Sequence, residues 1–188
     1  MMKRDEALKV LAERYPEGIV VPVFQSAFDW MGIRPHPLNY VCTGAMGQAS
    51  SHALGLALAR PDKMVAILDG DGSLLMNLGG LVTAANLAPK NLVHFVSFNK
   101  IYEVNGRYPI PAADQIDFSG IAKAAGYPRT FTFSNLAAFA DAIDEILDGS
   151  MLTFVTLEVK EGEMYPRDFT KLHSADAREA FRNAIRQN

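Results

Sequence analysis

The feature that most constrains the fold of this sequence is the regular alternation of short apolar runs with helix-like segments. The runs KMVAILDG (63–70), NLVHFVSFN (91–99) and MLTFVTLEV (151–159) consist mostly of apolar residues, which is typical of strands buried on both faces. Segments with apolar residues at helical spacing separate them, such as SNLAAFADAIDEILDG (134–149). Because strand–helix alternation favours parallel pairing through right-handed crossovers, the sequence predicts a three-layer, doubly wound α/β fold. Its sheet is expected to be mainly parallel, with helices on both faces.

The rest of the chain continues this pattern. Further strands are expected at 18–24, where Pro22 weakens or shifts the strand, and at 39–44 and 129–133. Further helices are expected at 5–15, 46–60, 74–88, 117–127 and 174–187. No internal repeat or linker interrupts these elements, and 188 residues suit one domain spanning 1–188.

Composition restricts the class of protein. Hydrophobic residues make up 49% of the chain, and the net charge of −3 comes from interspersed acidic and basic residues, with no basic stripe for nucleic acid. No apolar run is long enough to cross a membrane, and the N-terminal stretch lacks a signal-peptide core. The single cysteine, Cys42, excludes a disulfide framework within the chain. We therefore expect a cytoplasmic protein that binds neither nucleic acids nor membranes.

The most informative motif is Gly70-Asp71-Gly72-Ser73, which ends one apolar run, while Asn99 ends the next run 28 residues after Asp71. In doubly wound sheets, ligands bind beyond the carboxyl ends of the strands, so these residues are expected to meet there. Carboxylate and amide oxygens suit magnesium, which usually binds together with phosphates. The glycines allow a diphosphate to approach the backbone, and the following helix offers free N–H groups. Calcium or a magnesium-bound nucleotide would fit these residues equally well.

Two motifs of this sequence resemble motifs of the thiamine-diphosphate-dependent enzymes and occur in the same order along the chain. GDGS followed by a helix, a strand and FNKIYE (98–103) is similar to their cofactor fingerprint, and TGAMGQASSHALGLALAR (43–60) resembles an upstream segment of the same enzymes. The resemblance covers roughly residues 3 to 160 and is to the diphosphate-binding domain. Within the family the sequence resembles sulfopyruvate and phosphonopyruvate decarboxylases, especially the separate small subunit of the former. The resemblance implies magnesium and thiamine diphosphate as cofactors.

The resemblance also implies roles for individual residues. Asp71, Asn99 and the carbonyl of Ile101 would bind magnesium. Gly44 would accept a hydrogen bond from the aminopyrimidine of the cofactor, and Met46 would hold its two rings close together, so both would be catalytic. The residues expected to contact the cofactor are Gly44, Ala45, Met46, Gly70, Asp71, Gly72, Ser73, Asn99, Ile101, Tyr102 and Glu103.

Two positions depart from the family pattern. Phe98 stands where the family usually has the first Asn or Asp of a pair, and Lys100 replaces a common glycine. Lys100 could alter the loop or bring a positive charge near the phosphates. A substrate with a sulfonate or phosphonate group would need a cation, for which Arg34, Lys100 and Arg107 are candidates.

The resemblance finally implies a partner. In the family, a glutamate that bonds a pyrimidine ring nitrogen of the cofactor lies in a second α/β domain, for which this chain has no room. We therefore expect a heteromeric decarboxylase of small 2-oxo acids, whose second subunit carries the pyrimidine-binding domain and the activating glutamate. Carboligation of the acetolactate-synthase type, a subunit of a 2-oxo acid:ferredoxin oxidoreductase, and a non-catalytic binding or regulatory module are the alternatives.

Overall fold

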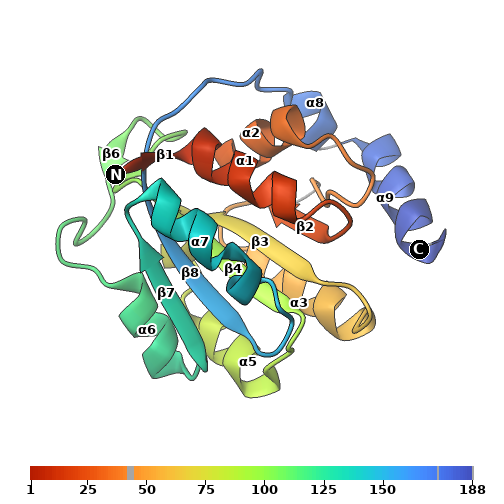
Figure 1. Ribbon diagram of the computed structural model, residues 1–188. Coiled ribbons are helices and arrows are strands. Elements are labelled where there is room, and N and C mark those ends of the chain that lie inside the picture. The colour runs from red at the N-terminus through yellow and green to blue at the C-terminus, as the bar shows by residue number, and fades with distance from the viewer. Residues whose placement is uncertain (42–44, 173, 188) are drawn as a thin grey trace.

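The computed structural model describes residues 1–41, 45–172 and 174–187, and its centre is a parallel β-sheet (Figure 1). The sheet order is β2-β3-β4-β8, and both β7 and β1 pair with β8. The strands are β1 (Met2–Lys3), β2 (Ile19–Pro22), β3 (Val65–Gly70), β4 (Leu92–Phe98), β7 (Arg129–Phe133) and β8 (Thr153–Lys160). Pro22, which cannot donate to a ladder, ends the edge strand β2.

Helices cover both faces of the sheet. Helices α1 (Arg4–Arg14), α2 (Gln25–Ile33) and α7 (Leu136–Ile146) contribute to one core, and α3 (Ala49–Ala59), α5 (Gly79–Leu87), α6 (Phe118–Ala125) and α9 (Ala175–Gln187) to the other. Alternate residues of β3 divide between the two cores, with Val65 and Ile67 on one face and Ala66 and Leu68 on the other. The three-layer, doubly wound α/β prediction is therefore confirmed, and the apolar strands are explained by burial on both faces.

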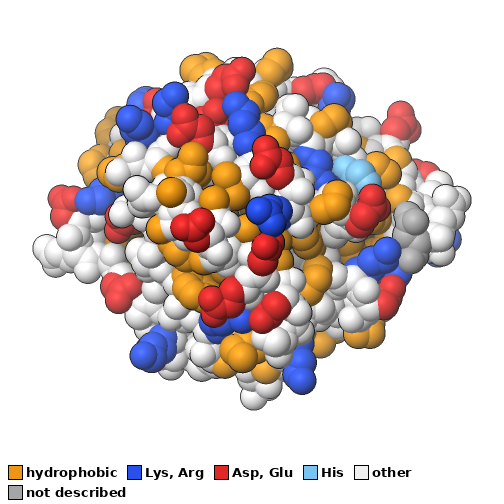
Figure 2. Space-filling view, in the orientation of Figure 1, with side chains coloured by type: hydrophobic (Ala, Val, Ile, Leu, Met, Phe, Trp, Pro, Cys, Tyr) orange, Lys and Arg blue, Asp and Glu red, His pale blue; other side chains and the backbone are white. Residues whose placement is uncertain are grey.

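The surface agrees with the mixed charge of the sequence. On the face shown in Figure 2, Lys and Arg side chains lie among Asp and Glu side chains rather than in a separate stripe. Among the described residues, no helix combines the length and the apolar character needed to cross a membrane.

Some elements differ from the sequence-based prediction. In the described part of 39–44 there is no strand, and only Asn39 bridges to Val20. The single helix expected at 74–88 is two helices, α4 (Asp71–Leu75) and α5, so that α4 begins within the glycine motif itself. The sequence does not predict α2, because most of its residues are buried and no amphipathic alternation marks it. A short helix, α8 (Phe169–Leu172), precedes α9.

The register of the sheet positions the predicted site. Gly70 at the end of β3 pairs with Ser97 near the end of β4. Asp71 and Asn99 therefore leave neighbouring strands at the same edge. Asn99 leads into a small hairpin formed by β5 (Ile101–Tyr102) and β6 (Tyr108–Pro109).

Candidate functional site

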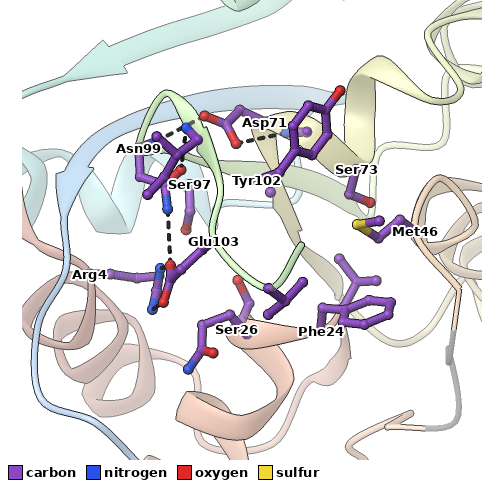
Figure 3. Close-up of a pocket in the computed structure, with 16 residues that line it drawn as sticks. Arg4, Phe24, Ser26, Met46, Asp71, Ser73, Ser97, Asn99, Tyr102 and Glu103 are labelled. Atoms are coloured by element: carbon purple, nitrogen blue, oxygen red, sulfur yellow. Dashed lines mark hydrogen bonds and ion pairs between the residues drawn. The ribbon is translucent and has the colours of Figure 1, made fainter. Parts of the chain in front are cut away.

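A pocket opens at the carboxyl ends of β2, β3 and β4 (Figure 3). It is lined by Arg4, Val23, Phe24, Gln25, Ser26, Met46, Gly70, Asp71, Gly72, Ser73, Ser97, Asn99, Ile101, Tyr102, Glu103 and Val104. Of the residues predicted from the sequence to contact a cofactor, only Gly44 and Ala45 are missing from this lining. Gly44 lies outside the described residues, and Ala45 is exposed.

Asp71 is an acidic residue of the pocket wall that is only 3% exposed. Its Oδ1 accepts the N–H of Gly72 at 2.7 Å, and its Oδ2 accepts the N–H groups of Asn99 at 3.1 Å and Lys100 at 2.6 Å. Burial raises the pKa of Asp71 to about 6, and the nearby carboxylate of Asp69 adds to this effect, although the three N–H groups oppose it. The described residues thus hold ionised Asp71 through backbone N–H groups, and a bound cation would offset its desolvation cost.

Asn99 and Ile101 bring further oxygens to the same edge. The Oδ1 of Asn99 accepts the N–H of Ile101 at 3.1 Å, and its Nδ2 donates to Oε2 of Glu103 at 3.0 Å. The carbonyl of Ile101 accepts the N–H of Glu103 at 3.0 Å and retains one lone pair. Lys100 lies between them with a φ of +69°, in the left-handed region that favours glycine. A glycine would adopt this conformation without the steric cost that a side chain brings.

The two glycines of the motif have different surroundings. A Cβ added to Gly70 would have no atom within 4 Å, so the bare backbone of Gly70 faces the open pocket. A Cβ on Gly72 would lie 2.5 Å from the ring of Tyr102, so this glycine is required by protein packing. The hydroxyl of Ser73 accepts the N–H of Gly47 at 2.9 Å and so ties α4 to the segment that carries Met46.

Among the described residues that line the pocket, Arg4 at the start of α1 is the one Lys or Arg, and no sequence pattern predicted it. The Nε of Arg4 donates to Asp29 at 2.6 Å, while Nη1 and Nη2 donate to the two carboxylate oxygens of Glu103 at 2.6 and 3.3 Å. These side chains are almost fully buried, with 5%, 1% and 10% exposed for Arg4, Asp29 and Glu103. No local sequence pattern predicts such a cluster, because Asp29 and Glu103 lie 25 and 99 residues from Arg4.

Each of the three cations proposed from the sequence already has a bonding partner. Arg34 is buried and bonds to Asn39 through its guanidinium. Lys100 pairs with Asp114 at 2.8 Å, and Arg107 pairs with Glu161. None of the three lines the pocket.

The donor set of the pocket fits magnesium. A carboxylate, an amide oxygen and a backbone carbonyl are hard oxygen ligands, and magnesium commonly combines one or two carboxylates with water and the oxygens of a phosphate ligand. Within the described ranges there is no group of three or more His, Cys, Asp or Glu side chains that could hold a metal. A metal at this site would therefore depend on Asp71, Asn99 and Ile101 together with oxygens of a ligand, for which Gly70 leaves space.

Comparisons with known proteins show the family to which the chain belongs. Residues 23–157 match the family model described as thiamine pyrophosphate enzyme, C-terminal TPP binding domain. The chain is 37% identical over 163 residues to sulfopyruvate decarboxylase subunit beta from Methanothermobacter thermautotrophicus, covering 86% of this chain and 84% of that protein. It is 34% identical over 176 residues to phosphonopyruvate decarboxylase from Streptomyces viridochromogenes, covering 93% of this chain but only 44% of that protein. The crystal structure of benzoylformate decarboxylase from Polynucleobacter necessarius has a similar fold, with a TM-score of 0.66 and 21% identity over 86% of this chain and 34% of that one.

Proposed function

Because this chain belongs to the thiamine pyrophosphate enzymes, through their C-terminal TPP binding domain, we propose that it is the diphosphate-binding subunit of a heteromeric 2-oxo acid decarboxylase dependent on magnesium and thiamine diphosphate. Its named relatives are decarboxylases, which supports the reaction class. The observation that carries the proposal is the buried carboxylate of Asp71, which accepts the backbone N–H of Asn99 at the carboxyl ends of two neighbouring strands.

Each residue at this edge has a proposed task. The carboxylate of Asp71, the amide oxygen of Asn99 and the carbonyl of Ile101 would hold magnesium. The bare backbone of Gly70 would admit the diphosphate, and the hydroxyl of Ser73 would lie against it. When bound, thiamine diphosphate supplies a sink for the electrons left behind as carbon dioxide leaves a 2-oxo acid.

Other residues would support the cofactor from its sides. Met46 is half-buried on the pocket wall and would hold the cofactor rings. Tyr102 packs over Gly72 and would close the wall beside the diphosphate, and Glu103 would act through its contacts with the metal-binding loop. Gly44 and Ala45 are proposed on the resemblance alone.

Two features support the need for a partner chain. The pocket has a volume of about 50 Å³, whereas pockets that bury a drug-sized ligand measure roughly 300–1,000 Å³, so this chain would cover only part of the cofactor. Helices α3 and α5 contain no charged residue, and they and the segment between them expose the large apolar side chains Leu58, Met76, Val82 and Leu87. The partner would bring the pyrimidine-binding domain and the activating glutamate, and the relative named subunit beta is consistent with such an arrangement.

The charges of the pocket restrict where a second anionic group of a substrate would bind. Among the described residues, Arg4 is the only Lys or Arg that lines the pocket, and two carboxylates already neutralise it. A sulfonate or phosphonate group would therefore be recognised by the partner. Residues 1–188 are proposed to form one domain, because both β1 and α9 pack onto the central sheet.

The proposal is tested by purifying the chain with its native partner and measuring carbon dioxide release from a panel of 2-oxo acids, with saturating magnesium and thiamine diphosphate. The complex should release carbon dioxide, and the chain alone should be nearly inactive. Formation of a 2-hydroxy-3-oxo acid from two molecules of 2-oxo acid, with one carbon dioxide released per condensation, would identify a carboligase instead. Robust decarboxylation by the isolated chain would contradict the requirement for a partner, and tighter binding of ATP than of thiamine diphosphate would contradict the cofactor.

A further inference from the structure

The buried cluster around Arg4 has a consequence for the metal site. We propose that Arg4 is a positioning residue that fixes the orientation of the Asn99 amide by holding Glu103. This inference rests on the proposed function, because it assumes that the amide oxygen of Asn99 binds magnesium. Arg4 lies outside residues 23–157, so the family model does not include it.

The first step is the orientation of the Asn99 amide. Its Nδ2 donates to Oε2 of Glu103 at 3.0 Å, and its Oδ1 accepts the N–H of Ile101 at 3.1 Å. Rotating the amide by 180° would place its oxygen against the carboxylate of Glu103 and its NH₂ against the N–H of Ile101. Both contacts would then be repulsive, since a carboxylate only accepts and an N–H only donates. The contact with Glu103 therefore keeps the NH₂ group of the Asn99 amide on the Glu103 side and its oxygen on the Ile101 side.

The second step is the immobility of Glu103. Arg4 binds both of its carboxylate oxygens, and the Oε2 that receives Nη1 at 2.6 Å is the same atom that receives the Asn99 amide (Figure 3). Arg4 is in turn fixed by Asp29, whose other oxygen accepts Nε2 of Gln25 at 2.9 Å. Planar, two-point pairs of this kind restrict orientation as well as distance. A continuous set of hydrogen bonds thus connects α1 and α2 to the loop after β4.

The charge of the cluster excludes a simpler role for Arg4. Two carboxylates surround one guanidinium, so the cluster as a whole is not positive and is a poor receptor for an anionic substrate. Without Arg4, Glu103 would lose the guanidinium that bonds both of its carboxylate oxygens and would be free to turn away from Asn99 or toward a bound metal. The guanidinium holds the Glu103 carboxylate where it accepts the Asn99 amide and prevents it from turning toward a bound metal.

The test measures metal affinity directly. The protein, purified with any partner that accompanies it, is titrated with Mn²⁺ in the presence of thiamine diphosphate, and free Mn²⁺ is followed by electron paramagnetic resonance. Arg4→Lys keeps the charge but loses the two-point geometry, and it should weaken Mn²⁺ binding by about 10- to 100-fold, the usual effect of losing a partner of a metal ligand. Glu103→Ala should weaken binding to a similar degree. Because both act through one contact, Arg4→Lys should have little further effect in a Glu103→Ala background.

The matched control is Arg129→Lys. Arg129 also forms a two-point pair with a carboxylate, at 2.8 and 3.0 Å to Asp148, but it does not line the pocket. Its Mn²⁺ affinity should be unchanged even if its melting temperature falls.

The outcomes separate the inference from the proposed function. Loss of Mn²⁺ binding in Asp71→Ala, with unchanged binding in Arg4→Lys and in Glu103→Ala, would overturn the positioning role and leave the proposed function intact. Mn²⁺ binding that does not depend on Asp71 would instead overturn the proposed function. If Arg4→Lys does not fold, Glu103→Ala, which leaves the Arg4–Asp29 pair in place, decides the question alone.

Discussion

Replacing Asp71 with asparagine should have opposite effects on two equilibria of this protein. The substitution keeps the size of the side chain but removes the charge of a buried carboxylate. Magnesium-dependent binding of thiamine diphosphate should be lost, because the only anionic ligand among the three proposed protein ligands disappears. The metal-free protein should nevertheless become more stable at pH 8, because a desolvated charge is no longer buried.

The size of the gain follows from the pKa. A rise of the Asp71 pKa from an ordinary 3.8 to about 6 corresponds to about 3 kcal/mol of folding free energy lost at pH 8. Asparagine recovers this amount, but its NH₂ group must face a backbone N–H. The smallest loss arises when it faces the single N–H of Gly72, at a cost of about 1–2 kcal/mol. The net gain in the free energy of unfolding is therefore expected to be about 1–2 kcal/mol.

The pH dependence identifies the cause. Because the folded-state pKa of Asp71 is raised, its carboxyl is protonated in both states below pH 4, and ionisation imposes no penalty there. As the pH rises from 4 to 6 the unfolded state ionises first, and the wild type loses stability relative to Asp71→Asn. The advantage of the variant should thus be present above pH 6 and disappear by pH 4.

The assay is urea denaturation with a chelator, at pH 8 and pH 4, alongside calorimetric titration of thiamine diphosphate with magnesium. Asp114→Asn is the control, because Asp114 is an exposed carboxylate whose pair with Lys100 contributes little. The desolvation explanation would be refuted if Asp71→Asn were clearly less stable than the wild type at pH 8. It would also be refuted if the variant gained as much free energy of unfolding at pH 4 as at pH 8. Unchanged cofactor affinity would refute the role of Asp71 in metal binding.

Three further results are expected. Gly70→Ala should leave the melting temperature unchanged, because its Cβ meets no atom within 4 Å, yet raise the Kd for thiamine diphosphate at least about tenfold in calorimetry by occupying the pocket. Gly72→Ala should lower the free energy of unfolding by about 1–3 kcal/mol in urea, because its Cβ would lie 2.5 Å from the ring of Tyr102; full stability would show that this ring moves freely. Magnesium affinity, titrated at pH 8 and pH 5, should fall below about pH 6 because Asp71 must lose a proton to bind, and equal affinities would contradict this.

The sequence alone determined the layers of the fold and the place of the site. Burial on both faces demands apolar residues along each strand, and this requirement leaves a pattern that can be read locally. The motif at Gly70–Ser73 and the position of Asn99 fall where strands end, so their meeting at one edge follows from parallel topology. The pocket indeed collects Met46, Asp71 and Tyr102 with them.

Tertiary structure alone decided the charges around that site. A local pattern shows that a residue is buried or polar, but it does not show which distant residue becomes its partner. Arg4 therefore remained unnoticed, whereas Arg34, Lys100 and Arg107 seemed equally suitable until their partners were known. The raised pKa of Asp71 has the same origin, because desolvation depends on everything packed around the carboxylate and not on its neighbours in sequence.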